Sequence, residues 1–232
     1  MKKRQGFTLA ELVLAVFIFA YMSASLATIY GTANRHMFQN YRKNVIKTNV
    51  LLSMKTIQNN LSVATRIDLP APGAQGDVLA FATNVDNLTG CYPVNQTSAS
   101  ANPPNLPAWH YFCLASDPAT PGFRSLYYHT GNLPGGTACG SPAATIWCSN
   151  NPVANGCYAV PVCGSSGGTI TKLMQYASPL TTFYSRRPAE EINEANTVRV
   201  TLRSYWPAPA FGSGQRSVDF SLDNVIMVNR PQ

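Results

Sequence analysis

One carboxylate is the first group in this sequence that could do chemistry, because Glu11 lies inside an otherwise apolar run. The run begins at Phe7, after a leader of six residues that carries three cations and ends at Gly6. Residues 12–34 carry no charge. An acid in such a segment is costly in lipid, so it indicates a functional site with a positively charged partner.

Six cysteines form the second reactive set, and all of them lie in the central part of the chain: Cys91, Cys113, Cys139, Cys148, Cys157 and Cys163. An even number in a chain that crosses a membrane predicts disulfides in an oxidising compartment. The sequence does not choose among the possible pairings. Zinc is the alternative, but no two cysteines have the short spacing of a typical zinc site, so no metal ligand is predicted.

A loop rich in glycine and serine gives a weaker, enzyme-like signal, since residues 164–168 have the Gly-x-Ser-x-Gly pattern around Ser166. A hydrolase needs this serine on a sharp strand-to-helix turn, with a histidine and an acid beside it. The Thr-Ile-Thr that follows does not predict such a turn, and His110 and His129 are interpreted as strand residues next to aromatic residues. We therefore expect no enzyme and no cofactor.

The element that must position Glu11 is a membrane-spanning helix. Its 23 uncharged residues, 12–34, would extend roughly 35 Å as a helix, which is enough to cross a bilayer. The cations of the leader predict a cytoplasmic N-terminus and an exported remainder. No small-residue cleavage site follows the apolar run, so the processing site that fits lies directly before it, between Gly6 and Phe7. The alternative is a single-pass anchor that is never cleaved.

The segment Lys-Lys-Arg-Gln-Gly-Phe-Thr-Leu-Ala-Glu, which ends at Glu11, resembles the prepilin-type leader and cleavage site of the type IV pilin-like superfamily. That family contains type IV pilus subunits and the pseudopilins of type II secretion systems. The resemblance implies cleavage after Gly6 by a prepilin peptidase, and methylation of the new amino terminus on Phe7. It also implies three further partners: other pilin or pseudopilin subunits, an inner-membrane assembly platform and the lipid bilayer.

Cleavage would supply the partner that Glu11 lacks. The new ammonium on Phe7 would lie one helical turn from the carboxylate, and in a stack of subunits Glu11 could meet the ammonium of a neighbour instead. Removing one partner of a buried ion pair costs about 3–5 kcal/mol. Such a pair would therefore fix the register in which subunits assemble.

One departure from the family pattern concerns the middle of the apolar segment. Major type IV pilins usually carry a helix-breaking proline there, whereas this chain has Thr28 and no proline before Pro70. The stretch 11–20 is more similar to minor pilins and to the J-type minor pseudopilins. The resemblance therefore favours a minor, initiating or tip-proximal subunit over the main fibre protein.

The helix is expected to continue beyond the membrane segment 7–34 as an amphipathic second half, 35–67. Residues 35–67 contain neither proline nor glycine. Apolar residues recur there every three or four positions, as on one face of a helix: Ile46, Val50, Met54, Ile57, Leu61 and Ala64. Two prolines and a glycine at 70–73 should end the helix. We expect the apolar face to pack on a globular domain.

The rest of the chain, 73–232, is expected to form one β-rich exported domain. Short apolar runs between turn residues predict strands at 78–83, 109–114, 123–129, 145–148, 157–162, 197–205 and 218–228. The second and third of these predict a hairpin. The last two alternate between apolar and polar residues, and the Gly-Ser-Gly-Gln stretch at 212–215 predicts a turn between them. The expected fold is α+β, the pilin fold: a long helix packed on an antiparallel sheet, with a disulfide-rich insertion at about 84–168.

The charge of the chain gives little sign of a nucleic-acid partner. Its formal net charge is +7, three units of which belong to the leader. Several other cations lie between residues 35 and 55, where solvent or lipid headgroups account for them. The sequence contains no block of basic residues and no nucleic-acid-binding motif, so nucleic acid is not an expected partner.

The sequence thus predicts a structural subunit that assembles through its N-terminal helix into a type IV pilus or a type II secretion pseudopilus. It would be anchored in the inner membrane, with its C-terminal domain in the periplasm. The alternative is an adhesin or DNA-uptake receptor displayed at the filament tip on the same scaffold. The aromatic stretches 109–112 and 126–129 are the feature that would carry such binding.

Overall fold

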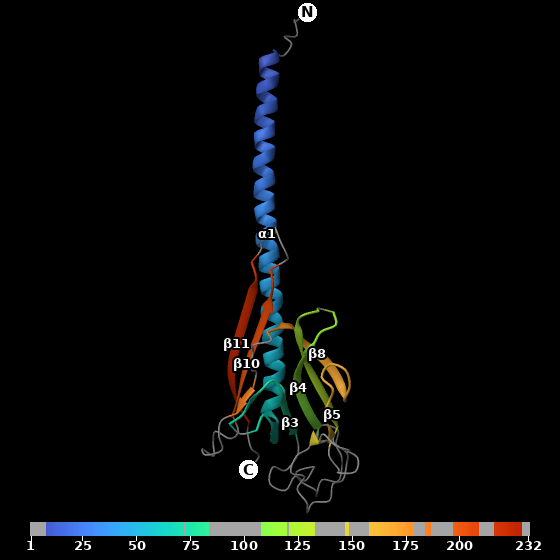
Figure 1. Ribbon diagram of the computed structural model, residues 1–232. Coiled ribbons are helices and arrows are strands. Elements are labelled where there is room, and N and C mark those ends of the chain that lie inside the picture. The colour runs from blue at the N-terminus through green and yellow to red at the C-terminus, as the bar shows by residue number, and fades with distance from the viewer. Residues whose placement is uncertain are drawn as a thin grey trace, which may run out of the picture. The chain divides into compact units, whose positions relative to one another are not determined.

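The computed structural model describes the chain at residues 8–71, 73–83, 108–119, 121–132, 147–148, 158–178, 184–186, 197–208 and 216–228. In these residues the chain forms one helix, α1 (Leu9–Ser62), and eleven strands (Figure 1). Its internal contacts divide it into two compact units. The first comprises Met1–Asn44 and Pro207–Val218, and the second comprises Val45–Trp206 and Asp219–Gln232.

Helix α1 has 54 residues and is continuous, as the absence of proline predicts. At about 1.5 Å per residue it is about 80 Å long. Thr28, at the position where a proline would interrupt the helix, instead donates a hydrogen bond from its hydroxyl to the carbonyl oxygen of Ser25, at 2.7 Å. The expected long N-terminal helix is confirmed.

The end of α1 differs from the sequence-based expectation. The helix ends at Ser62 rather than at residue 67, because the following residues join the sheet. The N–H of Thr65 donates to a carbonyl oxygen of β3 (Leu79–Thr83) at 2.9 Å, and β1 (Arg66–Leu69) pairs antiparallel with the same strand. Strand pairing thus overrides the helical pattern, although no proline forbids helix at these positions.

Nine strands form one sheet in the order β1-β3-β4-β5-β8-β10-β9-β2, with β11 paired to β10. Each pair with a defined register in this sheet is antiparallel. The bounds of the strands not yet given are Gln75–Gly76 for β2, Ala108–Ser116 for β4, Arg124–Asn132 for β5, Thr169–Ala177 for β8, Tyr184–Arg186 for β9, Thr197–Trp206 for β10 and Val218–Met227 for β11. A separate parallel pair joins β6 (Trp147–Cys148) to β7 (Tyr158–Ala159).

Two predicted strand pairs are confirmed. Strands β4 and β5 form the expected hairpin, paired from Ala108 opposite Asn132 to Ser116 opposite Arg124. Strands β10 and β11 also pair. Buried residues alternate with more exposed ones along β10, and half-buried residues alternate with exposed ones along most of β11. The turn predicted between them, at 212–215, lies outside the described residues.

The main core lies between the second half of α1 and the sheet. All six residues of the predicted apolar face of the helix are buried, from Ile46 to Ala64. From Val50 onward they pack with strand residues that include Phe81, Phe112 and Leu126. The packing of this helical face on an antiparallel sheet confirms the α+β architecture predicted from the sequence.

Four strands are not predicted from the sequence: β1, β2, β8 and β9. Strand β8 illustrates the reason, since its register against β5 shifts twice and Tyr176 has a positive φ of 58°. Such irregularities interrupt the two-residue alternation by which a strand is recognised. In the described residues, the predicted strands at 145–148 and 157–162 are reduced to the two-residue strands β6 and β7.

Candidate functional site

Glu11 lies in the first turn of α1 and is hydrogen-bonded to Thr8. The backbone N–H and the hydroxyl of Thr8 both donate to Oε2 of Glu11, at 3.0 Å each, and the N–H of Glu11 donates back to Thr8 Oγ1 at 3.3 Å. This is a capping box, in which two side chains satisfy free N–H groups at a helix start. Thr8 is not among the predicted site residues, although its Thr-x-x-Glu pattern is the signal for this motif.

The cap gives Glu11 a polar, uncharged partner, and among the residues that the structure describes no cation pairs with its carboxylate. Gly6 and Phe7 lie outside the described residues, so the cleavage site and the ion pair with a new ammonium stay predictions. What the structure adds is the position of the carboxylate, which is held beside the first residues of the helix.

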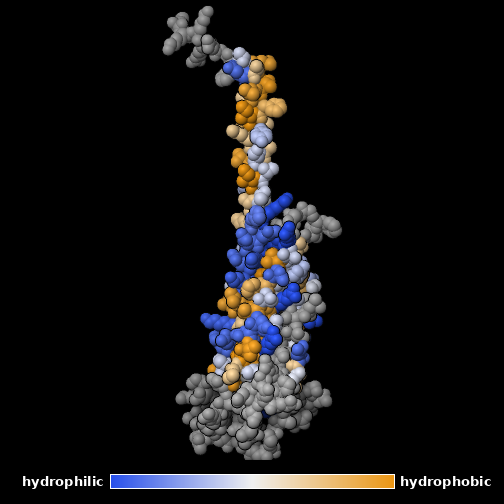
Figure 2. Space-filling model, turned by 90° about the vertical axis from the view of Figure 1, so that its left-hand side faces the viewer, coloured by the Kyte–Doolittle hydropathy of each residue, from blue (hydrophilic) through white to orange (hydrophobic). Residues whose placement is uncertain are grey.

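Apolar side chains cover the first half of α1 and are exposed. Phe17 and Phe19, for example, are 76% and 73% exposed. In the described residues α1 is the helix with the length and composition to cross a membrane, and its most apolar stretch is not buried in the molecule. Figure 2 shows this stretch as a mainly orange column. Such a surface requires a lipid or protein environment.

Three hydroxyl groups in this apolar segment are satisfied within the helix. Ser25 Oγ donates to the carbonyl oxygen of Tyr21 at 2.9 Å, and Thr32 Oγ1 donates to that of Thr28 at 2.9 Å. The hydroxyl of Thr28 donates to Ser25 in the same way. Hydroxyls bonded to their own helix need no water, so they are compatible with an apolar environment.

Arg42 corrects the expectation that the cations of residues 35–55 form a solvated face. It is only 5% exposed, and its guanidinium donates to the carbonyl oxygens of Pro207 and Arg216 at 3.1 and 3.3 Å. All three residues belong to the first unit, and the two acceptors flank the connection between β10 and β11. Arg42 therefore fixes both ends of this connection to the helix.

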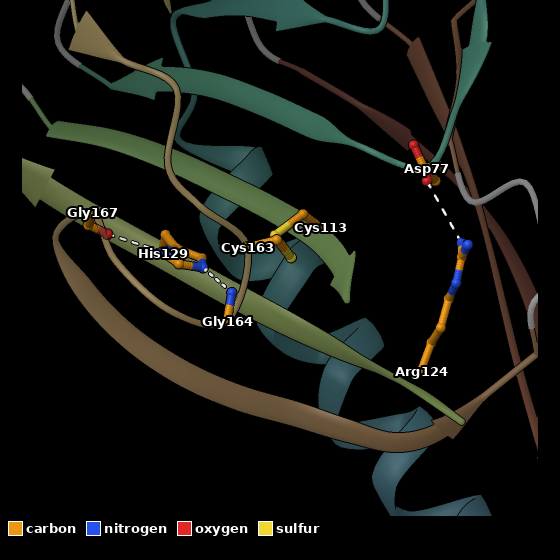
Figure 3. The surroundings of a disulfide bond; sticks show 7 residues. All are labelled: Asp77, Cys113, Arg124, His129, Cys163, Gly164 and Gly167. Carbon is orange, nitrogen blue, oxygen red and sulfur yellow. Dashed lines mark hydrogen bonds and ion pairs between the residues drawn. A yellow bond between two sulfur atoms is a disulfide. The ribbon is translucent and has the colours of Figure 1, made fainter. Parts of the chain in front are cut away.

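One of the predicted disulfides lies in the described residues. Cys113 of β4 and Cys163, in the loop before β8, are bonded, and their Cα atoms are 5.9 Å apart (Figure 3). Three further cysteines, Cys91, Cys139 and Cys157, lie outside the described residues. Cys148 lies in β6, where the structure describes the backbone alone.

His129 lies under the loop that carries Cys163 and is fully buried. The N–H of Gly164 donates to its Nε2 at 3.0 Å, and its Nδ1 lies 2.9 Å from the carbonyl oxygen of Gly167. Because a backbone N–H can only donate, Nε2 is the acceptor and Nδ1 carries the proton that bonds to Gly167. These two bonds fix one neutral tautomer of the ring.

His110 is a buried strand residue beside aromatic rings, as predicted. Its ring stacks on Phe81, with centroids 4.8 Å apart, and its Nδ1 lies 2.7 Å from the hydroxyl of Tyr128. Burial lowers the pKa of His110 to about 4, so the ring is neutral at pH 7. The neighbouring aromatic side chains Trp109, Tyr111, Phe112 and Tyr127 are also buried and belong to the core. These rings are therefore not available to bind a ligand.

Ser166 has no catalytic surroundings. It is exposed and forms a bridge with Val162, in which its N–H donates to the carbonyl oxygen of Val162 at 3.0 Å. The nearby His129 uses both ring nitrogens on Gly164 and Gly167. Within the part of the chain that the structure describes, no serine, histidine and acid come together in a triad.

A buried carboxylate, Asp117, holds the turn between β4 and β5. It accepts hydrogen bonds from the Ser125 hydroxyl at 2.8 Å, the N–H of Ala119 at 3.0 Å and the ammonium of Lys172 at 3.1 Å. The Ser125 hydrogen bond is the largest of the causes that lower the pKa of Asp117 to about 2. Asp117 is thus a charged anchor of the hairpin.

The fold combines a long helix, whose exposed apolar first half is capped by Thr8 and Glu11, with an antiparallel sheet. This arrangement fits a membrane-anchored protein. Residues 1–27 match the prokaryotic N-terminal methylation motif. Together with the long apolar helix α1, this match supports a type IV pilin-like prepilin. The architecture and the disulfide between Cys113 and Cys163 are consistent with the pilin fold. Comparisons with curated proteins and with solved structures give no match.

Proposed function

We propose that this chain is a minor subunit of a type IV pilus or of a type II secretion pseudopilus, and that it helps to start or cap the filament. A prepilin peptidase cleaves it between Gly6 and Phe7, and the new amino terminus on Phe7 is methylated. The C-terminal domain is then periplasmic. Helix α1 stays in the inner membrane until an assembly platform brings it together with other pilin or pseudopilin subunits.

The exposed apolar half of α1 is the observation that supports this proposal most strongly. Its side chains, such as Leu14 and Phe17, are 62% and 76% exposed, so they need either lipid or the helices of other subunits. The continuous helix at Thr28 supports the minor role, because the family resemblance associates a proline at this position with the main fibre protein.

Glu11 has two successive roles in this proposal. Before assembly its carboxylate caps α1 through Thr8, which holds it in one position at the end of the apolar segment. In the filament it pairs with the methylated ammonium of Phe7 in a neighbouring subunit. A buried carboxylate without that ammonium costs about 3–5 kcal/mol, so a misplaced subunit is rejected.

Two variants of Glu11 separate these roles. Glutamine can replace glutamate in a capping box but carries no charge, whereas alanine removes both the cap and the charge. We expect Glu11→Gln and Glu11→Ala to reach the membrane normally and to be depleted from sheared filaments to a similar extent. The measurement is the ratio of chain in the filament fraction to chain in the membrane fraction, with Thr32→Val as a control change in the same helix.

Normal incorporation of Glu11→Ala would contradict the proposed role in assembly. If Glu11→Gln is incorporated into filaments normally and Glu11→Ala is not, the cap matters for assembly and the ion pair does not.

The alternative of a tip-displayed adhesin or DNA receptor is tested by deleting the gene. Loss of filaments supports initiation, and normal filaments with lost adhesion or DNA uptake support the receptor.

A further inference from the structure

Cys113, His129 and Cys163 bring two sulfur atoms and an imidazole together from three separate segments. Cys113 comes from β4, His129 from β5 and Cys163 from the loop before β8 (Figure 3). The two sulfur atoms and a ring nitrogen all lie within 4.8 Å of one another. Two thiolates and an imidazole form a ligand set that soft divalent cations prefer.

One of the two hydrogen bonds of His129, that of Nδ1, has the arrangement found at a metal-binding histidine. Such residues hold one ring N–H on a carbonyl or carboxylate, which fixes the tautomer and leaves the lone pair of the other nitrogen for the metal. Here Nδ1–H donates to the carbonyl oxygen of Gly167 at 2.9 Å. The lone pair of Nε2 points to the N–H of Gly164, the residue directly after Cys163.

The loop that carries Cys163 has supports other than the disulfide. The N–H groups of Ser165 and Ser166 both donate to the carbonyl oxygen of Val162, at 2.9 and 3.0 Å, and the N–H of Val162 donates back to Ser166 at 3.0 Å. With the bond from Nδ1–H of His129 to the carbonyl oxygen of Gly167, these contacts hold the loop over β5. The sulfur of Cys163 therefore remains near Cys113 and His129 when the disulfide is open.

We propose that the reduced cysteine pair and His129 form a binding site for a soft divalent cation such as Zn²⁺. The disulfide and the metal site are then two alternative ways of linking the loop that carries Cys163 to β4. This inference goes beyond the proposed role in a filament and does not rest on it. The Cα atoms of Cys113 and Cys163, 5.9 Å apart, are close enough for two side chains to reach one cation through zinc–sulfur bonds of about 2.3 Å.

Passing from the disulfide to the metal site requires a two-electron reductant. A phosphine reductant and water break the sulfur–sulfur bond: the two sulfurs gain two electrons and two protons, and the phosphine becomes a phosphine oxide. The cation then takes both sulfurs as thiolates, and their two protons pass to the buffer. Nε2 of His129 replaces its bond from Gly164 by a bond to the metal, and water completes a tetrahedral site.

Binding of Co²⁺ to the full chain in detergent, reduced with a phosphine, tests the proposal. Thiolate ligands give Co²⁺ charge-transfer bands, so the titration reports both affinity and ligand type. In the double variant Cys113→Ser, Cys163→Ser, we expect the number of Co²⁺ ions that give these bands to fall by one per chain. His129→Gln should weaken binding at this site by at least about tenfold, because glutamine can keep both hydrogen bonds but lacks the imidazole lone pair.

His36→Gln, which changes an exposed histidine of α1, is the matched control and should bind as the wild type does. Unchanged binding in the double cysteine variant would show that the metal is held elsewhere, and unchanged affinity in His129→Gln would remove the histidine from the site. Either result overturns the proposal. Circular dichroism of each histidine variant in its oxidised form, compared with the oxidised wild type, shows whether the variant folds.

Protection from alkylation in the wild-type chain gives a readout that needs no variant. We expect Zn²⁺ to slow the alkylation of reduced Cys113 and Cys163 by at least about tenfold, as measured by peptide mass spectrometry, because a metal-bound thiolate is shielded. Equal alkylation rates with and without Zn²⁺ would overturn the proposal, whatever the variants do.

Discussion

The hydroxyl of Thr8 lies 3.0 Å from Oε2 of Glu11 at the start of the apolar helix, and the N–H of Thr8 donates to the same oxygen. From the sequence, Glu11 is a carboxylate without a polar neighbour in an apolar run. In the structure it is part of the helix start and satisfies donors that lipid cannot. The single chain thus holds the acid in place before a second subunit arrives.

Replacing Thr8 by valine tests the cap without changing the charge of Glu11. Loss of a helix cap costs about 1 kcal/mol, so we expect about fivefold faster amide hydrogen exchange in the first turn, at Glu11 and Leu12. NMR of the chain in detergent measures this rate. Thr8→Ser keeps the hydroxyl and should exchange like the wild type. Equal exchange in Thr8→Val and Thr8→Ser would mean that the hydroxyl does not stabilise the helix start.

Asp117 should matter far more to stability than another aspartate of the same domain. Asp117→Ala leaves Ser125 and Lys172 without their buried acceptor, so we expect the free energy of unfolding to fall by about 2–3 kcal/mol. Asp77 forms an exposed ion pair with Arg124 at 3.9 Å (Figure 3), and Asp77→Ala should cost less than about 1 kcal/mol. Urea unfolding of both variants measures the difference, and equal losses would contradict this account of the hairpin.

The buried His110 predicts a loss of stability in mild acid. Its pKa is lowered from 6.5 to about 4 in the folded chain, so between these values the unfolded chain binds a proton that the folded chain does not. The free energy of unfolding should therefore fall as the pH drops through this window and should stop falling, for this group, below about 4. The pKa of Asp117 is lowered from 3.8 to about 2, so its own loss of stability comes at lower pH.

His110→Phe keeps a ring in the stack with Phe81 but cannot be protonated. The measurement is the free energy of unfolding in urea at a series of pH values. Between pH 6.5 and about 4, this free energy should change less with pH in the variant than in the wild type. Identical slopes in His110→Phe and the wild type would show that His110 is not kept neutral by burial.

Replacing Gly168 and Gly122 by alanine separates the cost of backbone strain from the cost of a steric clash. Both have a positive φ, 69° and 86°, so alanine is strained at either position. A Cβ at Gly122 meets no atom within 4 Å, whereas a Cβ at Gly168 overlaps the carbonyl oxygen of Thr130 and the ring of Trp109. We expect Gly122→Ala to lower the free energy of unfolding by about 1 kcal/mol and Gly168→Ala by about 3 kcal/mol. Thermal unfolding measures both, and equal losses would contradict the packing at Gly168.

Local patterns predict much of this fold. The helix, the β4–β5 hairpin and the β10–β11 pair follow from periodicity and turn residues, because each depends on neighbours in the chain. The helix end at Ser62 does not follow from them, since Thr65 bonds to β3, a strand 17 residues further along the chain. Strand β8 is missed for a related reason: its irregular register depends on β5.

The site shows the same division between local and distant interactions. Gly6, Phe7 and Glu11 are recognised as a contiguous motif, and Thr8 is also within reach of sequence reasoning as part of a capping box. The cluster of Cys113, His129 and Cys163 is not, because it forms only when β4, β5 and the loop before β8 meet. The pairing of these two cysteines could be known only from their distance in the fold.

Mass spectrometry of the N-terminus of the chain isolated from its membrane tests the central claim most directly. Under the proposed function the chain must be processed before it assembles, because the ammonium that would pair with Glu11 forms only on cleavage. We predict an N-terminal peptide that begins at Phe7 and carries one methyl group on its amine. A chain that still begins at Met1, or a Phe7 terminus that never enters filaments, would contradict the account.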